Sequence, residues 1–437
     1  MTDLPKTYHV KSFGCQMNVY DGERMAELLG AQGMTATADA SAADLVVLNT
    51  CHIREKAADR AYSDVGRLRR DDGSKPLIAL AGCVAQAEGE EAKRRSKMID
   101  MVVGPQAYHR LPEMVAAAAS GQRPVDTDMP AISKFDALPA RRRTGPSAFL
   151  TVQEGCDKFC TYCVVPYTRG AEISRPASDI IAEAEALAIS GAREITLLGQ
   201  NVNAWSDGSS GLDTLIRRIA RISGVERIRY MTSHPTDMTE ALITAHGEVP
   251  ELMPYLHLPV QAGSDRILKA MNRSHTAASY VSIIEQARRA RADIAISGDF
   301  IVGFPGETEE DFEATLSIID KVRYAAAYSF KYSPRPGTPA ASMPDQVPPQ
   351  VMDERLQRLQ ARLAVHSLAF NQATVGKATR ILIDRKGRLP GQMIGKTPWL
   401  QSVFVETSAA IGEMVDVVTT AALPNSLAGV LATAKAA

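Results

Sequence analysis

The stretch 155–163, read as GCDKFCTYC, places Cys156, Cys160 and Cys163 in a C-x3-C-x2-C spacing. A closed structural metal site usually takes four protein ligands. Neither a fourth cysteine nor a histidine lies within twenty residues of these three. Iron–sulfur clusters also bind thiolates, and they tolerate one corner that no cysteine holds. The spacing therefore predicts a cluster whose fourth iron is open to a small molecule.

Strand and helix patterns alternate around this stretch, from residue 147 to about residue 339. The cysteine loop directly follows the first strand, where functional groups of parallel α/β barrels lie. Six strand–helix units of this length fit a partial parallel barrel or a doubly wound sheet. The expected strands are 148–154, 194–200, 227–233, 256–261, 295–304 and 327–334, and the expected helices include 177–191, 212–224, 265–272 and 308–323.

The first 105 residues or so also alternate strand and helix, with strands expected at 8–14, 43–50, 76–82 and 99–104 and helices at 19–33, 54–70 and 84–96. Cys15, Cys51 and Cys83 each follow one of the first three strands. Ligand sites of open parallel sheets lie beyond the carboxyl ends of the strands. The pattern therefore predicts a second metal site with three protein thiolates.

Two other readings of the N-terminal cysteines stay open. A zinc site with three cysteines and one histidine could use His9, His52 or His109. Adjacent residues seldom chelate one ion comfortably, which weakens the case for His52 beside Cys51. Three disulfides are disfavoured because a large chain with no secretion signal is expected in a reducing compartment.

The chain as a whole has 437 residues, enough for two or three domains, and a net charge of −1. That charge does not by itself indicate a nucleic-acid partner. The N-terminus lacks a basic stretch followed by an apolar run, and no segment approaches about 20 apolar residues, so we expect neither a signal peptide nor a membrane span. A cytoplasmic location is the default expectation.

The remaining segments complete the organisation. Prolines punctuate residues 106–146, and their turn-rich end resembles a linker. One amphipathic helix is expected over 348–376. The last 60 residues or so show short β-rich runs between Gly and Pro, typical of a small antiparallel barrel.

The β-rich tail is mildly basic. Residues 375–437 hold seven Lys or Arg and four Asp or Glu. Such a barrel could bind the backbone of RNA and stack one base, or it could be a structural barrel with ordinary surface charges. The candidate contacts are Arg380, Arg385, Lys386, Arg388, Lys396 and Trp399.

Several motifs together carry a resemblance to a known family. They are KSFGCQMNVYDGERM (11–25), LTVQEGCDKFCTYCVVPYTRGAEISRP (150–176), LLGQNVNAW (197–205), TSHP (232–235), HLPVQAGS (257–264), DFIVGFPGET (299–308) and YSPRPGTPA (332–340). With the spacing of the first three cysteines, they resemble the methylthiotransferase branch of the radical S-adenosylmethionine superfamily. The match covers essentially the whole chain.

The resemblance implies an α/β fold in three parts. These are an N-terminal doubly wound parallel sheet of flavodoxin type (5–120), a partial (βα)6 radical-SAM barrel with its C-terminal helix (147–373), and a small antiparallel, OB-like TRAM barrel that binds RNA (374–437). Residues 121–146 are expected to be a linker.

The resemblance also implies a chemistry. In the family each cysteine triad holds a [4Fe–4S] cluster, and S-adenosylmethionine chelates the open iron of the cluster on Cys156, Cys160 and Cys163. The reduced cluster cleaves that cofactor to a 5′-deoxyadenosyl radical. A second S-adenosylmethionine methylates a sulfur on the open iron of the auxiliary cluster, held by Cys15, Cys51 and Cys83. The methylthio group then passes to C2 of an adenine, so the two triads are expected to face each other across an unstacked base.

Cofactor contacts are expected at the ends of the barrel strands. By resemblance, Gly199 lets the backbone approach the amino group, and later segments hold the ribose and adenine. An ordinary turn at Gly303 and Gly306, and a helix-start charge at Glu307, are the plainer interpretations. The expected cofactor-binding residues are Gly199, Gln200, Asn201, Ser233, Gln261, Val302 and Glu307.

Within the family, the motifs are most similar to the branch that modifies dimethylallyl-adenosine beside the anticodon of tRNA. Ala262 stands where the family more often has Ser. Two alternatives keep the chemistry but use threonylcarbamoyl-adenosine in tRNA or an aspartate of a ribosomal protein. A third is a non-enzymatic RNA-binding metal protein. The expected partners are the tRNA anticodon stem-loop, S-adenosylmethionine and an electron donor such as a flavodoxin or ferredoxin.

Overall fold

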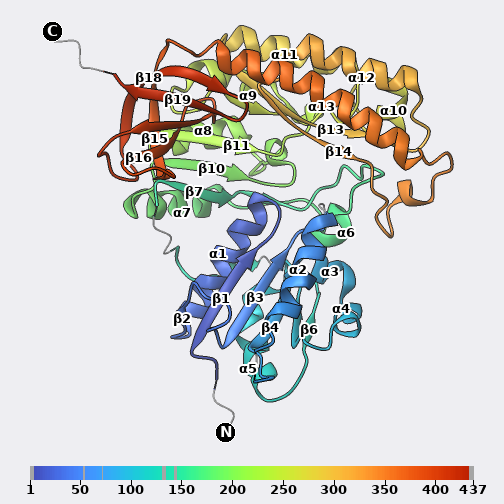
Figure 1. Cartoon of the computed structure of the whole chain (residues 1–437), viewed down its shortest axis with the longest axis vertical. Coiled ribbons are helices and arrows are strands. Elements are labelled where there is room, and N and C mark those ends of the chain that lie inside the picture. The colour runs from blue at the N-terminus through green and yellow to red at the C-terminus, as the bar shows by residue number, and fades with distance from the viewer. Residues whose placement is uncertain (1–3, 53–54, 71, 130–133, 142–144, 433–437) are drawn as a thin grey trace. The chain divides into compact units, whose positions relative to one another are not determined.

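The computed structural model describes residues 4–52, 55–70, 72–129, 134–141 and 145–432 (Figure 1). The chain divides into two compact units. The first contains residues 1–143, 154–157 and 163–173, and the second contains 144–153, 158–162 and 174–437. In the described residues, no helix combines the length and apolar character that crossing a membrane requires.

The first unit is built on one parallel sheet with the strand order β2-β1-β3-β4-β5-β6. Its strands are β1 (Thr7–Ser12), β2 (Thr35–Ala36), β3 (Leu45–Thr50), β4 (Leu77–Gly82), β5 (Met101–Val103) and β6 (Val125–Asp126). All six residues of the central strand β3 are buried, as the continuous apolar run predicts. The order 2-1-3-4-5 is that of flavodoxin-like folds, which confirms the predicted fold of this part.

The helices of this unit differ from the expected ones in two places. A single helix is expected over 84–96, but Gly89, with φ +50°, divides it in two. Helix α5 and the short strand β6 form in a segment with little periodicity. The helices are α1 (Gln16–Ala31), α2 (Glu55–Arg67), α3 (Cys83–Glu88), α4 (Glu90–Arg95), α5 (Leu111–Ala119), and the 3-10 turns η1 (Tyr108–Arg110) and η2 (Lys134–Ala137).

A linker was expected over 121–146, but its described residues 121–129 and 134–141 belong to the first unit. Lys134 and Arg141 in it are buried, with 2% and 7% of their surface exposed. Arg141 pairs with Glu23 on α1. Buried charged groups require fixed partners, so the described part of this segment is integral to the unit and does not act as a free tether.

The second unit begins with a set of parallel strands, each followed by a helix. The strands form two sheets, β7-β10-β11 and β12-β13-β14, which an isolated parallel bridge between Ile228 and Leu252 connects. They are β7 (Ser147–Thr151), β10 (Glu194–Leu198), β11 (Arg227–Met231), β12 (Tyr255–His257), β13 (Ala295–Val302) and β14 (Ala326–Lys331). This arrangement confirms the predicted partial (βα)6 barrel.

Helices cover one face of these strands and form the largest apolar core with them. They are α7 (Ala177–Ile189), α8 (Leu212–Ile219), α9 (Glu240–Glu248), α10 (Asp265–Ala270), α11 (Ala277–Ala290) and α12 (Glu309–Val322). The remaining short elements of the chain are α6 (Val165–Arg169), β8 (Gln153–Glu154), β9 (Ile173–Ser174), η3 (Val202–Ala204), η4 (Pro235–Asp237) and η5 (Pro339–Ser342).

The C-terminal part consists of the long helix α13 (Pro349–Gln372) and a closed five-stranded barrel with the order β15-β16-β17-β19-β18 (Figure 1). The strands are β15 (Ala378–Lys386), β16 (Gln392–Lys396), β17 (Ser402–Glu406), β18 (Met414–Leu423) and β19 (Ser426–Leu431). The sequence predicts an antiparallel barrel. That prediction is wrong for one pair of strands, because β17 and β19 pair in parallel.

Two buried arginines join the small barrel to the strands of the large one. Arg227 donates hydrogen bonds to the carbonyls of Lys396 and Arg380, both at 2.7 Å. Arg229 donates to the carbonyls of Thr397 and Pro398. Because these acceptors are backbone groups, the loop after β16 is held in one place whatever its side chains are.

Candidate functional site

Cys15, Cys51 and Cys83 lie at the carboxyl ends of three neighbouring strands. Cys15 caps α1 just after β1, Cys51 follows β3, and Cys83 begins α3 directly after β4. Cys15 is hydrogen-bonded to Cys51, and it lies close enough to Cys83 to raise the pKa of that thiol. A Cβ on Gly14 would lie 2.3 Å from the Cβ of Cys51, so only glycine permits this close approach. The prediction that the three cysteines share one sheet edge is confirmed.

The chemistry of this triad is that of buried thiols. The hydrogen bond with Cys51, followed by burial, raises the pKa of Cys15 well above its usual value. Burial also raises the pKa of Cys83, while the nearby Arg169 lowers both. Iron or zinc binds thiolates, so a metal must displace these protons. All six cysteines of the chain are free of disulfides.

The arrangement suits a cluster better than a single ion. In the described part of the chain, no three His, Cys, Asp or Glu side chains are arranged to hold one metal ion. The Nδ1 atom of His9 contacts the carbonyl of Thr37 at 2.9 Å. In a [4Fe–4S] cluster each thiolate binds a different iron, so the three sulfurs need not converge on one point. The donor set therefore fits the cluster, and the zinc alternative gains no support.

The beginning of the second cysteine loop depends on glycine. The backbone N–H of Cys156 donates to the carbonyl of Gly170 at 3.3 Å. Gly155 has φ +73°, and a Cβ there would lie 1.8 Å from the carbonyl oxygen of Ala171. Both the backbone conformation and the space exclude other residues. This explains why glycine precedes the first cysteine of the loop.

The middle of the same loop is fastened to the end of α10. Thr161 donates its backbone N–H to the carbonyl of Met271 and its hydroxyl to that of Ala270. The side chain of Asn272 donates to the carbonyl of Phe159, whose φ is +48°. Arg273 Nη1 lies 3.8 Å from Cys160 Sγ, within range of a hydrogen bond to sulfur. Contacts between protein groups therefore fix the conformation of the loop.

The turn after β10 holds three of the expected cofactor residues. The Oε1 atom of Gln153 accepts the backbone N–H groups of Gln200 and Asn201 at 2.9 and 3.0 Å. A Cβ on Gly199 would lie 2.5 Å from that Oε1 atom. Asn201 in turn donates its side-chain amide to Asp237. Glycine at 199 is thus required for the approach of Gln153, a reason that the sequence did not suggest.

Two other expected cofactor residues carry buried polar atoms without a partner in the described part of the chain. These are Ser233 Oγ and Glu307 Oε1. Glu307 Oε2, by contrast, accepts the backbone N–H of Gly303 at 2.6 Å and Arg355 at 2.9 Å. Burial raises the pKa of Glu307, although Gly303 and Arg355 oppose the shift. Because buried polar atoms normally find partners, the two orphan oxygens fit a polar ligand such as S-adenosylmethionine.

The last two expected cofactor residues offer mainly backbone. Gln261 has φ +77°, accepts the N–H of Ile301 and donates its own to Asp299. Val302 ends β13 and is fully buried.

Comparison with known proteins agrees with this geometry. Three family models match the chain: the uncharacterized protein family UPF0004 over residues 7–104, the radical SAM superfamily over 150–319, and the TRAM domain over 372–432. The tRNA-2-methylthio-N(6)-dimethylallyladenosine synthases of Sphingopyxis alaskensis and Novosphingobium aromaticivorans are 68% and 67% identical to it. Each alignment covers 98% of this chain and 98% of the relative.

The chain belongs to the radical S-adenosylmethionine methylthiotransferase family.

Solved structures share the fold of this methylthiotransferase at low sequence identity. The radical S-adenosylmethionine methyltransferase TsrM from Kitasatospora setae has a TM-score of 0.58 at 15% identity, covering 77% of this chain and 76% of that one. The cobalamin-dependent enzyme OxsB has a TM-score of 0.54 at 11% identity, covering 84% and 57%. At these identities the likeness concerns the fold alone.

Two histidines of the methylthiotransferase were missed by the sequence reasoning. The rings of His234 and His275 lie 5.9 Å apart in an edge-to-face contact. Burial, reinforced by Arg273, lowers the pKa of His234 to about 2 and that of His275 to about 3, so both are neutral at pH 7. The Nε2 atom of His234 is another buried atom with no partner among the described residues. His234 stands in the TSHP motif beside Ser233, which was the signal that could have found it.

A buried ion-pair network beside the first triad was missed as well. Arg169 pairs with Asp21 at 2.6 Å and with Glu154 at 3.0 Å. Lys134 pairs with the same Glu154 at 2.8 Å. Each of these four side chains is at most 3% exposed. Three of them lie within six residues of a cysteine, in motifs quoted for the resemblance, but the fourth comes from the supposed linker.

The expected RNA contacts fall into two groups. Arg380, Arg385, Lys386 and Arg388 are exposed on the small barrel, whereas Lys396 and Trp399 are partly buried. Lys396 Nζ donates to Ser402, and burial lowers the pKa of Lys396. Trp399 Nε1 donates to the carbonyl of Asp293. The exposed four remain the better candidates for phosphate contacts.

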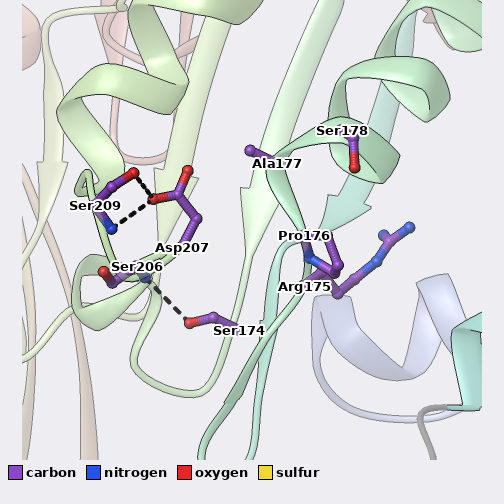
Figure 2. A pocket seen from close by; sticks show the side chains of 8 residues that line it. All are labelled: Ser174, Arg175, Pro176, Ala177, Ser178, Ser206, Asp207 and Ser209. Atoms are coloured by element: carbon purple, nitrogen blue, oxygen red, sulfur yellow. Dashed lines mark hydrogen bonds between the residues drawn. The ribbon is translucent and has the colours of Figure 1, made fainter.

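A surface hollow of about 460 Å³ lies elsewhere, at the start of α7 (Figure 2). Asp207 there accepts hydrogen bonds from the backbone and hydroxyl of Ser209, and Ser174 accepts one from the N–H of Ser206. These polar groups satisfy one another, and none of the expected cofactor or cluster residues lines the hollow. We assign it no role in the methylthiotransferase.

Proposed function

We propose that this protein transfers a methylthio group to C2 of N(6)-dimethylallyladenosine beside the anticodon of tRNA. The observation that carries the proposal is the 68% identity, over 98% of both chains, to a synthase named for that product. The six cysteines of the two triads, all free of disulfides, also support the proposal. C2 of adenine has no acidic proton and no leaving group, so general acid–base catalysis has nothing to act on.

The protein's part is to hold the groups that supply the difficult chemistry. Cys156, Cys160 and Cys163 would hold one [4Fe–4S] cluster, and Cys15, Cys51 and Cys83 the other. When bound, the clusters and two molecules of S-adenosylmethionine supply the radical, the methyl group and the sulfur.

The chain's own residues orient those groups. Gln153 fixes the turn of residues 199–201, and Arg355 fixes the loop from Gly303 to Glu307. Ser233 Oγ and Glu307 Oε1 each offer a free hydrogen-bonding position to the cofactor. His234, which stays neutral, can offer a ring nitrogen without adding charge.

Three further assignments belong to the proposal. Arg380, Arg385, Lys386 and Arg388 bind phosphates of the anticodon stem-loop. A flavodoxin or ferredoxin supplies electrons. The reaction takes place in the cytoplasm, where tRNA is modified.

The test is nucleoside mass spectrometry of tRNA incubated with the anaerobically reconstituted protein, dithionite and S-adenosylmethionine. Matched tRNAs carrying dimethylallyl-adenosine, threonylcarbamoyl-adenosine or unmodified adenosine serve as substrates. We expect a methylthio product only with the first. A product on the second tRNA would support threonylcarbamoyl-adenosine as the substrate. If 5′-deoxyadenosine formed but no tRNA gained a methylthio group, the result would support a ribosomal protein as the substrate. A protein that forms no 5′-deoxyadenosine would be the non-enzymatic RNA-binding protein instead.

A further inference from the structure

Arg169 is a buried, positively charged residue that interacts with the N-terminal cysteine triad. It ends helix α6, which packs against α3, the helix that Cys83 begins. Its guanidinium hydrogen-bonds Cys83, and its charge acts on Cys15 as well. The same guanidinium binds Asp21 and Glu154. Arg169 thus connects two carboxylates to the sulfur ligands of the expected auxiliary cluster.

Stability alone does not account for such a network. Removing charges from water is expensive, and apolar residues of similar volume often serve a protein's stability as well as a buried ion pair does. Here four charged side chains are buried together, and they come from α1, from residue 134, from β8 and from α6. Their position beside three thiols suggests that the network holds one cation in a fixed place.

A fixed cation acts on an iron–sulfur site in two ways. It favours the thiolate form of the cysteines, which iron requires. It also stabilises the reduced cluster, because reduction adds one negative charge, and hydrogen bonds to the sulfurs act in the same direction. The first effect favours assembly of the cluster, and the second raises its midpoint potential.

We propose that Arg169 is a positioning residue that raises the reduction potential of the auxiliary cluster, by holding its guanidinium against Cys83 and beside Cys15. The inference rests on the proposed function in one respect: Cys15, Cys51 and Cys83 must hold a [4Fe–4S] cluster. Asp21 and Glu154 orient the guanidinium and do not contact the cluster themselves.

Lys134 provides a matched control within the same network. It carries the same charge, is equally buried, and pairs with the same Glu154. Its other contacts are Asp21 at 3.9 Å, the carbonyl of Pro105, and the rings of Tyr108 and Phe135. Lys134→Gln therefore removes one buried positive charge without removing the contact with Cys83.

The experiment is a redox titration, followed by electron paramagnetic resonance, of protein in which Cys156, Cys160 and Cys163 are replaced by alanine. Only the auxiliary cluster can then assemble, and dithionite reduces it by one electron. We expect Arg169→Gln to lower the equilibrium constant for reduction about tenfold, which is about 59 mV for one electron. Lys134→Gln should change it less than threefold. Arg169→Lys, which keeps the charge, should recover most of the difference.

Arg169→Gln leaves two buried carboxylates with one cation, and an unpaired buried charge destabilises the fold. Arg169→Gln combined with Glu154→Gln keeps the network's total charge unchanged, and we expect the same tenfold loss from it. Equal shifts in Arg169→Gln and Lys134→Gln, or no shift in the double variant, would overturn the inference alone. If the protein that retains Arg169 assembled no auxiliary cluster, both the proposed function and the inference would be overturned.

Discussion

The two cysteine triads solve the same chemical problem with different parts of the chain. Cys156, Cys160 and Cys163 come from one loop of eight residues, whereas Cys15, Cys51 and Cys83 come from three strand ends across 69 residues. In each triad a buried arginine approaches one sulfur: Arg273 approaches Cys160, and Arg169 approaches Cys83. A ligand set can therefore be encoded by local spacing or by sheet topology.

The surroundings of the two arginines differ. Arg169 is bound by two carboxylates, which are part of an ion-pair network. Arg273 donates to the carbonyl of Pro259 and lowers the pKa of the neighbouring His234 and His275. The first site thus uses fixed charges of both signs, and the second uses a cation beside neutral rings. This difference predicts different responses to mutation and to pH.

The largest expected effect is the loss of radical chemistry. Replacing Cys156, Cys160 and Cys163 by alanine should abolish both 5′-deoxyadenosine and the methylthio product. Iron should fall from about eight to about four atoms per chain, because one cubane remains. Iron analysis and product chromatography measure both. If the variant still cleaved S-adenosylmethionine, these three cysteines would not hold the cluster that cleaves it.

Two glycines should each be required for assembly of one cluster. Gly155→Ala and Gly14→Ala place a Cβ 1.8 and 2.3 Å from its nearest neighbour, so each variant should lose about half of the iron, from its own triad. Gly121→Ala is the control, because it shares the positive φ but has no atom within 4 Å of the added Cβ. If all three variants contained the same number of irons per chain, close packing at the two glycines would not be required for cluster assembly.

The two regions should respond differently to acid. Burial holds the pKa of His234 near 2 and of His275 near 3, so the unfolded chain binds more protons below pH 6.5 and stability falls as pH falls. Between pH 6.5 and 5, each histidine should cost about 2 kcal/mol of unfolding free energy. Thermal unfolding across this range measures the loss, and His275→Gln should reduce its slope.

The network of the first unit should not contribute to this loss. Burial opposes ionisation of Glu154, but Lys134 and Arg169 prevail and hold its pKa below the usual value. Stability from a carboxylate with a lowered pKa is present above its unfolded pKa and is lost only in stronger acid. If Glu154→Gln flattened the profile between pH 6.5 and 5, this assignment would be wrong.

The smallest expected effect concerns RNA binding. Replacing Arg380, Arg385, Lys386 and Arg388 together by alanine should weaken tRNA binding by roughly tenfold and reduce its salt dependence by up to about three counterions. Iron content should not change. Arg218→Ala on α8 is a control for loss of an exposed charge outside the small barrel. Equal binding by the quadruple variant and the control would place the tRNA elsewhere.

The sequence predicted what local pattern and topology determine. The order of apolar strands placed Cys15, Cys51 and Cys83 at one edge, and the loop spacing identified the second triad. It did not predict the network of Asp21 and Arg169, which lie 148 residues apart. Lys134 was hidden in a turn-rich segment, because burial of a charge depends on partners that no local pattern reveals.

The same limit applies to the small barrel and to the cofactor turn. Strand propensity predicted a barrel, but the parallel pairing of β17 with β19 follows from closure of the sheet. The resemblance predicts that Gly199 lets the backbone approach the cofactor, whereas in the structure the side chain of Gln153 occupies the space beside it. The sequence therefore indicated that a glycine is needed at this position, but it did not predict the contact that requires it.

The most direct test of the account is a single reaction with the variant Cys15→Ala, Cys51→Ala, Cys83→Ala, assayed for 5′-deoxyadenosine and for methylthio-adenosine in dimethylallylated tRNA. We expect about four irons per chain, continued formation of 5′-deoxyadenosine, and no methylthio product. A variant that still makes the product would contradict the division of labour between the two triads. So would a folded variant with four irons that forms no 5′-deoxyadenosine.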